Sequence, residues 1–186
     1  FSEDPYLAGK LAASYIRGLQ SQGVAACVKH FAANNQETRR MSGSSRVEER
    51  TLHEIYLPAF EDAVKEGHVR SVMCAYNAVN GTFCSENEEL LNGILRRDWG
   101  FDGFVVTDWG AAKRRPLGIK AGVDLEMPGS RQGKTEAILK ALEEGTLTRE
   151  ELDQAVRNQL RFVREALENQ KEDAVKGTPR GVFRLR

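Results

Sequence analysis

An apolar strand that ends in a carboxylate and an indole is the first place in this sequence where chemistry can occur. In the segment GFVVTDWG (103–110), the apolar run Phe104 to Val106 has the composition of a buried strand, and Asp108 and Trp109 follow it. A carboxylate on a rigid strand end can act as a nucleophile or general base, for example at the anomeric carbon of a sugar. An indole can form an apolar floor under a sugar ring. The structural alternatives are an aspartate that caps the next helix and a tryptophan packed in the core.

A second polar pair, Lys29 and His30, ends another strand-like segment. A lysine at the end of a buried strand needs a partner or a ligand, because a buried ammonium group is costly. Both side chains can donate hydrogen bonds to neighbouring sugar hydroxyls. For Lys29 the alternatives are an ion pair with a structural carboxylate such as Glu37 and a Schiff base in a barrel aldolase. A polar loop follows that can orient a polyol or hold itself in place; its polar residues are Asn34, Asn35, Gln36, Glu37, Arg39 and Arg40.

Four strand-like segments carry these groups at their carboxyl ends. Their ranges are 24–31, 69–76, 103–108 and a short one within 119–127. The second is followed by Tyr76 and Asn77. The fourth contains Asp124 and Glu126, which point to the same side of a strand and are candidates either for the pocket or for structural pairing.

Helical patterns separate the strands. Asp4 and Pro5 predict the start of a helix that runs to Gln20. The range 47–66 predicts a helix that Pro58 kinks or divides. Capping boxes predict two further helix starts, Ser85 with Glu88 and Thr148 with Glu151. Apolar residues recur at helical spacing in the first and last helices, at Leu7, Leu11, Tyr15 and Leu19 and at Leu152, Val156, Leu160, Val163 and Leu167.

The alternation of strands and helices predicts an α/β fold. We interpret residues 1–174 as a partial (β/α)8 TIM-type barrel, roughly its second half, with parallel strands and flanking helices, and 175–186 as an irregular tail. A doubly wound sheet is the alternative, but no glycine-rich phosphate fingerprint follows any strand. In a barrel all strand carboxyl ends open on one face, so the polar residues are expected to converge there.

Composition narrows the class of partner. Lysine plus arginine (27) equals aspartate plus glutamate (27) among 186 residues, which argues against nucleic acid or an anionic membrane surface. No apolar run approaches a membrane span, and the start does not resemble a signal peptide. Three scattered cysteines fit neither a disulfide framework nor a zinc pattern, and no metal or cofactor is expected. Cys27 and Cys74 are predicted to be small buried residues, and free thiols favour a reducing compartment such as the cytoplasm.

Six colinear stretches resemble glycoside hydrolase family 3, in its β-glucosidase branch. They are FSEDPYLAG (1–9), CVKHFAANNQETRR (27–40), ERTLHEIYLPAFEDAVKEG (49–67), SVMCAYNAVNG (71–81), LRRDWGFDGFVVTDWGA (95–111) and AGVDLEMPG (121–129). The resemblance implies a retaining enzyme that releases terminal β-D-glucosyl residues from glucosides or gluco-oligosaccharides. Asp108 is the implied nucleophile. The implied substrate-binding residues are Lys29, His30, Met73, Tyr76 and Trp109.

Departures from the family pattern are also present. Acetylglucosaminidase members resemble KHFPGHG and carry an acid/base pair on that loop, whereas this chain reads KHFAANNQE. Glucosidase members take the acid/base from a later domain. After Trp109 the family usually has a segment such as VNDRV, whereas this chain has AAKRRPLGIKAG (111–122), and the tail KGTPRGVFRLR (176–186) has no likeness. We interpret that tail as a truncated or frame-shifted end.

The resemblance therefore implies a fragment that needs a missing barrel half and a following domain. Alone it is expected to be inactive and to self-associate, because a half barrel exposes two strand edges. Two other functional classes stay open at this point. One is the Schiff-base aldolase that uses Lys29, and the other is a non-catalytic sugar-binding or assembly half-barrel.

Overall fold

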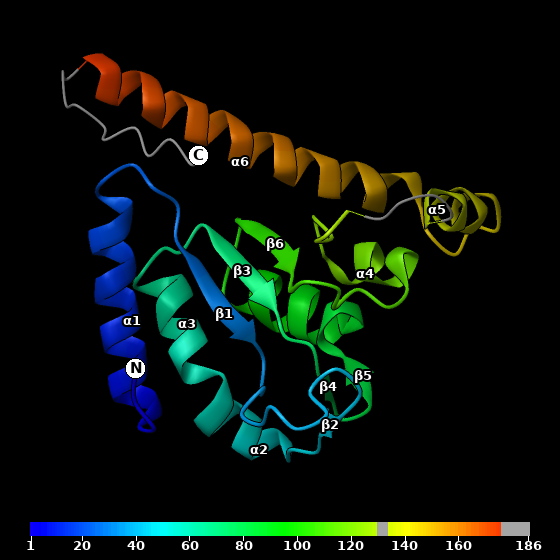
Figure 1. Ribbon diagram of the computed structural model, residues 1–186, viewed down its shortest axis with the longest axis horizontal. Coiled ribbons are helices and arrows are strands. Elements are labelled where there is room, and N and C mark those ends of the chain that lie inside the picture. Colours follow the sequence, from blue (N-terminus) through cyan, green and yellow to red (C-terminus); the bar gives the residue numbers. More distant parts are fainter. Residues whose placement is uncertain (130–133, 176–186) are drawn as a thin grey trace, which may run out of the picture.

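The main sheet contains three parallel strands. A computed structural model describes residues 1–129 and 134–175. Within it β1 (Cys27–Phe31), β3 (Ser71–Cys74) and β6 (Phe104–Thr107) pair in the order β1-β3-β6, with β3 in the centre (Figure 1). The predicted α/β fold with parallel strands and flanking helices is confirmed. Because parallel strands end at the same edge, this pairing brings the three carboxyl ends together.

Helices cover one face of this sheet. They include α1 (Pro5–Gln20), α3 (Pro58–Lys65) and a π-helical segment, Glu89–Asp98. The core they enclose is apolar, and its most deeply buried members include Phe31, Leu57, Val72, Leu91, Leu95 and Val105. Burial of each such side chain contributes about 1.5–3 kcal/mol to folding. The core therefore lies between the sheet and these helices.

The helix predicted over 47–66 is divided, as Pro58 indicated. It begins as α2 (Glu49–Thr51), continues as the π-helical turn Leu52–Tyr56, and resumes as α3 from Pro58. Proline has no N–H and fits the first turn of a helix. The amide of Leu57 instead donates to the Leu52 carbonyl at 3.0 Å, which closes the wider turn.

The first helix begins as predicted but packs through an unexpected face. The Asp4 carboxylate accepts hydrogen bonds from the amides of Tyr6 and Leu7 at 2.8 and 3.2 Å. The buried residues of α1 are small ones, Gly9, Ala12 and Ala13 with Ile16, whereas Leu7, Leu11 and Tyr15 are exposed. Small side chains allow α1 to approach α3 closely: a Cβ at Gly9 would meet the Asp62 carboxylate at 2.3 Å. The large apolar residues of α1 are left on the surface.

A small second sheet is formed by three short strands, one before β3 in the sequence and two after it. It contains β2 (Ser44–Ser45), β4 (Ala78–Val79) and β5 (Thr82–Phe83), and a 3₁₀ turn, Cys84–Glu86, comes next. The capping box predicted for Ser85 and Glu88 is wrong, because the amide of Leu90 donates to the Asn87 side chain at 3.1 Å instead. Ser85 donates to the Ala111 carbonyl at 3.2 Å and is engaged elsewhere.

The fourth strand predicted within 119–127 is reduced to one bridge. Residues up to Ala121 belong to α4 (Arg115–Ala121), and only Leu125 pairs with β6, opposite Val106. The reason lies in Asp124, whose side chain accepts a hydrogen bond from the Val105 amide at 2.7 Å. In a regular strand pair the Val105 amide would donate to a backbone carbonyl, and here the Asp124 carboxylate accepts that hydrogen bond instead.

Two helices end the described chain, α5 (Lys134–Glu143) and α6 (Arg149–Val175). The predicted capping box at the start of α6 is confirmed, with the Thr148 amide 2.7 Å from the Glu151 carboxylate and the Glu151 amide 3.2 Å from the Thr148 hydroxyl. The helix extends to Val175, and the remainder of the predicted tail, 176–186, lies outside the described residues.

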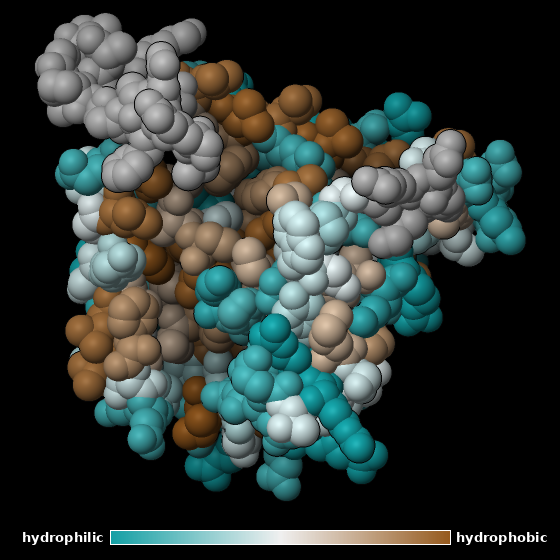
Figure 2. Space-filling view, viewed as in Figure 1, coloured by the Kyte–Doolittle hydropathy of each residue, from teal (hydrophilic) through white to brown (hydrophobic). Residues whose placement is uncertain are grey.

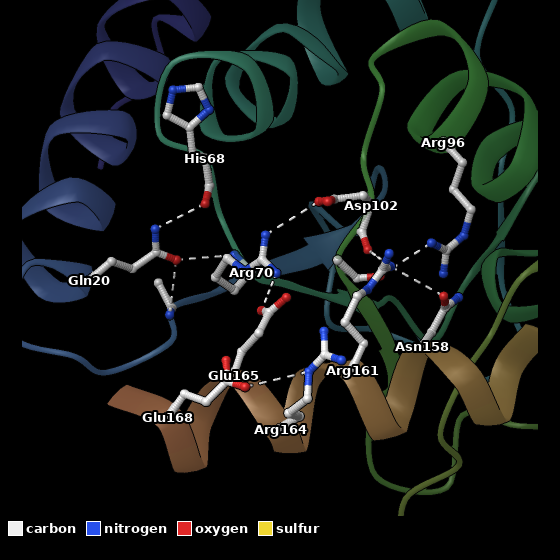
Figure 3. Close-up of polar contacts among 12 residues, drawn as sticks. Gln20, His68, Arg70, Arg96, Asp102, Asn158, Arg161, Arg164, Glu165 and Glu168 are labelled. Carbon is white, nitrogen blue, oxygen red and sulfur yellow. Dashed lines mark hydrogen bonds and ion pairs between the residues drawn. The ribbon is translucent and has the colours of Figure 1, made fainter. Parts of the chain in front are cut away.

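Charged residues tie α6 to the amino ends of the strands. Arg70, just before β3, pairs with Glu165 of α6 and with Asp102, which precedes β6, at 3.4 Å (Figure 3). Arg161 of α6 donates to the Asp102 carbonyl, and the Phe162 ring stacks on Phe104 at 5.0 Å. These contacts hold α6 at the end of the sheet opposite the predicted site.

Large apolar side chains remain on the surface of α1 and α6 (Figure 2). On α6 they form a stripe in which each member is at least 44% exposed: Val156, Leu160, Val163 and Leu167.

Cys27 is exposed, so the prediction that it is buried is wrong, because β1 lies at the edge of the sheet. Cys74 and Cys84 are buried and free. Searched over the described residues, the helices include none that is long and apolar enough to cross a membrane.

We expect Asp124→Ala to lower the free energy of unfolding by about 3 kcal/mol or more. The Asp124 side chain is 2% exposed and pairs with Arg96 at 2.7 Å, with further hydrogen bonds from the Val105 amide and, at 2.8 Å, from Asn158. Removing one partner of a buried pair leaves the other charge uncompensated, which typically costs about 3–5 kcal/mol.

Urea denaturation followed by circular dichroism measures the change. Asp98→Ala is the matched control, because Asp98 pairs with Arg97 at 3.0 Å but is 50% exposed. Such surface pairs contribute about 0–1 kcal/mol. Equal losses for the two variants would contradict the prediction.

Candidate active site

Three side chains from different strands meet at the carboxyl edge of the sheet. Asp108 directly follows β6, His30 lies in β1, and Tyr76 lies two residues beyond β3. The His30 Nε2 atom is 3.2 Å from Asp108 Oδ2. The Asp108 carboxylate raises the pKa of Tyr76, so these two groups are neighbours as well. The structure therefore brings together residues that lie 32 to 78 positions apart in the sequence.

The end of β1 has an irregular backbone that carries His30 and Lys29. The peptide bonds Lys29–His30 and Phe31–Ala32 are both cis. The pairing of β1 with β3 changes register between Val28 and Phe31, and the Ala75 amide then donates to the Phe31 carbonyl at 2.7 Å. Lys29 is exposed.

The Asp108 side chain is held at both oxygens. Its Oδ1 accepts a hydrogen bond from the Trp109 amide at 2.6 Å, and its Oδ2 faces His30. The side chain is 16% exposed, so one approach from solvent stays open. The next helix, α4, begins only at Arg115. Asp108 is therefore not the cap of that helix, and the structural alternative for it is wrong.

Tyr76 links the nucleophile candidate to the following loop. Its hydroxyl donates a hydrogen bond to the Trp109 carbonyl at 2.8 Å. Burial raises the pKa of the Tyr76 phenol, and the Asp108 carboxylate raises it further. The phenol is therefore a neutral hydrogen-bond donor at neutral pH.

Arg40 also belongs to the site. From the sequence it was predicted only to be one of several polar residues in the loop after β1. Its guanidinium lies over the Tyr76 ring, 4.7 Å from the centroid, and pairs with Glu37 at 2.7 Å. The pairing predicted as an alternative for Lys29 is therefore made by Arg40. Within the described part of the chain Lys29 forms no ion pair. The signal in the sequence was the run of charged residues after β1, which did not say which one faces Tyr76.

Two further predicted site residues, Trp109 and Met73, lie directly after Asp108 and within β3. The Trp109 side chain is on the surface, with 63% of the residue exposed, so its alternative assignment to the core is wrong. Met73 is half-buried on β3, opposite Val106 of β6.

Burial lowers the pKa of His30, and the adjacent Asp108 carboxylate opposes that shift. Lys29 and Arg40 lower it further, because nearby cations disfavour a second positive charge. Burial and the two cations outweigh the Asp108 carboxylate, so the pKa of His30 lies below its ordinary value of 6.5. His30 is therefore mainly a neutral imidazole at pH 7, able to donate at one nitrogen and accept at the other.

The two remaining acidic candidates have structural partners. Asp124 pairs with Arg96, and Glu126 pairs with Arg115 at 2.5 Å. Over residues 1–129 and 134–175, no group of three or more histidines, cysteines and acidic residues is arranged to hold a metal ion. The chemistry available is thus that of one carboxylate with a neutral imidazole, a phenol and two nearby cations.

Comparisons with known proteins show which family the chain resembles. Residues 1–162 match the family model described as the glycosyl hydrolase family 3 N terminal domain. The chain is 55% identical over 174 residues to thermostable beta-glucosidase B of Acetivibrio thermocellus, covering 94% of this chain and 23% of that protein. It is 45% identical to an exo-alpha-(1->6)-L-arabinopyranosidase of Bifidobacterium longum, covering 88% of this chain and 21% of that protein. The chain spans about a quarter of the length of the curated relatives it matches.

A solved structure supports the same comparison. The chain superimposes on beta-glucosidase 3B from Thermotoga neapolitana in complex with glucose, with a TM-score of 0.86 and 50% identity. The match covers 92% of this chain and 25% of that one. The strands and helices described above are thus arranged as in part of that enzyme.

We expect the pKa of His30 to lie below 6.5, and Asp108→Asn to lower it further. The substitution removes the negative charge that favours protonation, while burial, Lys29 and Arg40 continue to oppose it. Titration of the imidazole by heteronuclear NMR measures both values. An unchanged or raised pKa of His30 in the variant would contradict the contact between the two side chains.

Proposed function

The chain belongs to glycosyl hydrolase family 3, and we propose that it supplies the nucleophile and part of the glycone subsite of a retaining β-glucosidase. The observation that carries the proposal is the position of Asp108, on a rigid strand end with one oxygen held by the Trp109 amide and the other facing His30. A nucleophile must be both fixed and accessible, and this carboxylate is both.

In the proposed reaction the Asp108 carboxylate attacks the anomeric carbon of a terminal β-D-glucosyl residue. The C–O bond to the aglycone breaks through an oxocarbenium-like transition state, and the departing oxygen takes a proton from a general acid. The product of this step is a glycosyl ester of Asp108. Water, deprotonated by the same acid/base group, then attacks the anomeric carbon from the opposite face and restores the free carboxylate.

The neighbouring side chains have distinct proposed roles. Lys29 and neutral His30 bind glucose hydroxyls, the first as a cationic donor and the second as a donor or acceptor. Tyr76 keeps the Trp109 backbone in place next to the nucleophile. Met73 and the exposed Trp109 indole provide apolar surface for the sugar ring.

The acid/base residue is proposed to lie outside these 186 residues. In retaining enzymes the two carboxyl groups are about 5–5.5 Å apart. The acidic neighbours described here have other partners: Asp124 and Glu126 pair with arginines, and Glu37 pairs with Arg40. We therefore propose that activity needs the remaining barrel strands and a following domain.

The arabinopyranosidase relative favours a second candidate substrate, a terminal L-arabinopyranosyl residue. The chemistry at Asp108 would be the same, and the difference would lie in the fit of the sugar. The similarity to named β-glucosidases favours neither a Schiff-base aldolase nor a non-catalytic module.

We expect Asp108 to be labelled by a 2-deoxy-2-fluoro β-glucoside that bears a good leaving group. The experiment uses a chimera in which this chain replaces the matching segment of the Acetivibrio thermocellus relative. The fluorine slows hydrolysis of the glycosyl ester, so the intermediate accumulates and peptide mapping locates it. Asp108→Asn should abolish labelling and lower kcat on an aryl β-glucoside by about 10⁴-fold or more, as removal of a catalytic group does elsewhere.

Asp102→Asn is the matched control, because Asp102 is an exposed acidic residue near the opposite end of the same strand. An aryl L-arabinopyranoside tested in parallel separates the two candidate sugars. Label on any residue other than Asp108, or an active Asp108→Asn chimera, would overturn the proposal. Turnover by the isolated 186-residue chain would overturn the part that places the acid/base elsewhere.

We also propose that the isolated chain self-associates through its exposed apolar surfaces. Leu160 is 64% and Leu167 is 52% exposed on α6, and Tyr15 is 63% exposed on α1. Contiguous apolar surface of this kind marks an interface or an aggregation site. Light scattering after size-exclusion chromatography should show a mass above 20.8 kDa, and Leu160→Lys with Leu167→Lys should shift it toward the monomer. A stable monomer with the unchanged sequence would contradict the proposal.

A further inference from the structure

The loop between Asp108 and α4 is held from one side by a short neighbouring segment. We call residues 109–114 the nucleophile loop and residues 83–86, from the end of β5 through the 3₁₀ turn, the bracket. Three residues of the bracket each contact a residue of the loop. The loop begins at Trp109, next to the proposed nucleophile, so contacts that fix the loop also help to fix the position of Trp109 in the site.

The strongest of the three contacts joins Glu86 to Arg114. One carboxylate oxygen of Glu86 accepts the Arg114 backbone amide at 2.7 Å. The other accepts Nε and Nη2 of the Arg114 guanidinium at 3.1 and 2.6 Å. The Glu86 side chain is 2% exposed, so its charge is buried and depends on this partner. The Arg114 side chain is 68% exposed, and over residues 1–129 and 134–175 its ion pair is with Glu86.

The other two contacts lie along the same edge. Ser85 donates a hydrogen bond to the Ala111 carbonyl at 3.2 Å. The ammonium group of Lys113 lies 5.2 Å from the centroid of the Phe83 ring. A weak cation–π contact and a neutral hydrogen bond hold a loop less firmly than a bidentate ion pair with a buried carboxylate. The Glu86–Arg114 pair is therefore the main anchor.

The other end of the loop is bonded directly to the site. The Trp109 amide donates to Asp108 Oδ1 at 2.6 Å, and its carbonyl accepts the Tyr76 hydroxyl at 2.8 Å. The Gly110 amide donates to the Met127 carbonyl at 2.8 Å. A shift of the loop would change the direction of the Trp109 amide and the place of its indole together.

We infer that the Glu86–Arg114 pair positions the nucleophile loop, and that Arg114 thereby controls how well the site binds sugar. The inference rests on the proposed function and adds a positioning residue to it. Arg114 touches neither substrate nor Asp108 and acts through the loop on Trp109. The effect should appear mainly in KM, because the indole contacts the sugar in the ground state as well as in the transition state.

The test compares Arg114→Gln, Arg114→Lys and Arg97→Gln in the chimera described above. Arg97 is the matched control, since its side chain is 66% exposed and it pairs with exposed acids, Asp98 and Glu89. We expect Arg114→Gln to raise KM for an aryl β-glucoside about tenfold with a smaller fall in kcat. Arg114→Lys should recover part of the loss, because an ammonium group can still pair with Glu86. Arg97→Gln should match the parent.

A second readout does not depend on activity. Hydrogen exchange of the peptide that contains residues 108–114, measured by mass spectrometry on the 186-residue chain, should be faster in Arg114→Gln than in Arg97→Gln. A purely structural role would lower the active fraction, and so kcat, without moving KM. An unchanged KM in Arg114→Gln, or unchanged exchange in the loop, would overturn the inference. An inactive parent chimera would instead count against the proposed function, and the exchange result would still decide whether Arg114 holds the loop.

Discussion

The parallel pairing of β1, β3 and β6 is the constraint on which the rest of the structure depends. Parallel strands all end at one edge, so every residue that follows a strand is delivered to the same place. Asp108 and Tyr76 reach the site for this reason, and His30 joins them where β1 departs from regular pairing with β3. At the opposite edge, α6 covers the amino ends of the strands and is held there by the ion pair between Arg70 and Glu165.

The electrostatics of the site follow from partial burial. Asp108 and His30 are both partly buried, with 16% and 28% of their side chains exposed, and Tyr76 is buried. Burial lowers the pKa of His30 and raises that of Tyr76, and both shifts favour neutral side chains. Neutral His30 lies beside the carboxylate without neutralising it through a full ion pair, and neutral Tyr76 holds the Trp109 backbone next to it. The nearby cations, Lys29 and Arg40, are directed to solvent or to an aromatic ring.

The same fold is held by a few buried charges and leaves much apolar surface outside. Asp124 joins Arg96 of the segment Glu89–Asp98 to Asn158 of α6 and to the backbone of β6, so one carboxylate connects three elements. Glu86 joins the bracket to the nucleophile loop through its contacts with Arg114. The stripe on α6 and the large residues of α1 contribute little to this core. The chain is thus well packed around its sheet and leaves large apolar side chains exposed on α1 and α6.

The sequence alone determined that three parallel strands alternate with helices, where α1 and α6 begin, and that Asp108 stands at a strand end. These features depend on residues within one turn or one strand, as when Thr148 and Glu151 cap a helix, so local chemistry encodes them. Only the tertiary structure decided that small residues of α1 face α3, that Leu125 makes a single bridge, and that Arg40 rather than Lys29 takes Glu37. Each of those outcomes depends on atoms brought together from distant positions, where packing and competition for one partner decide, and no local pattern records which competitor wins.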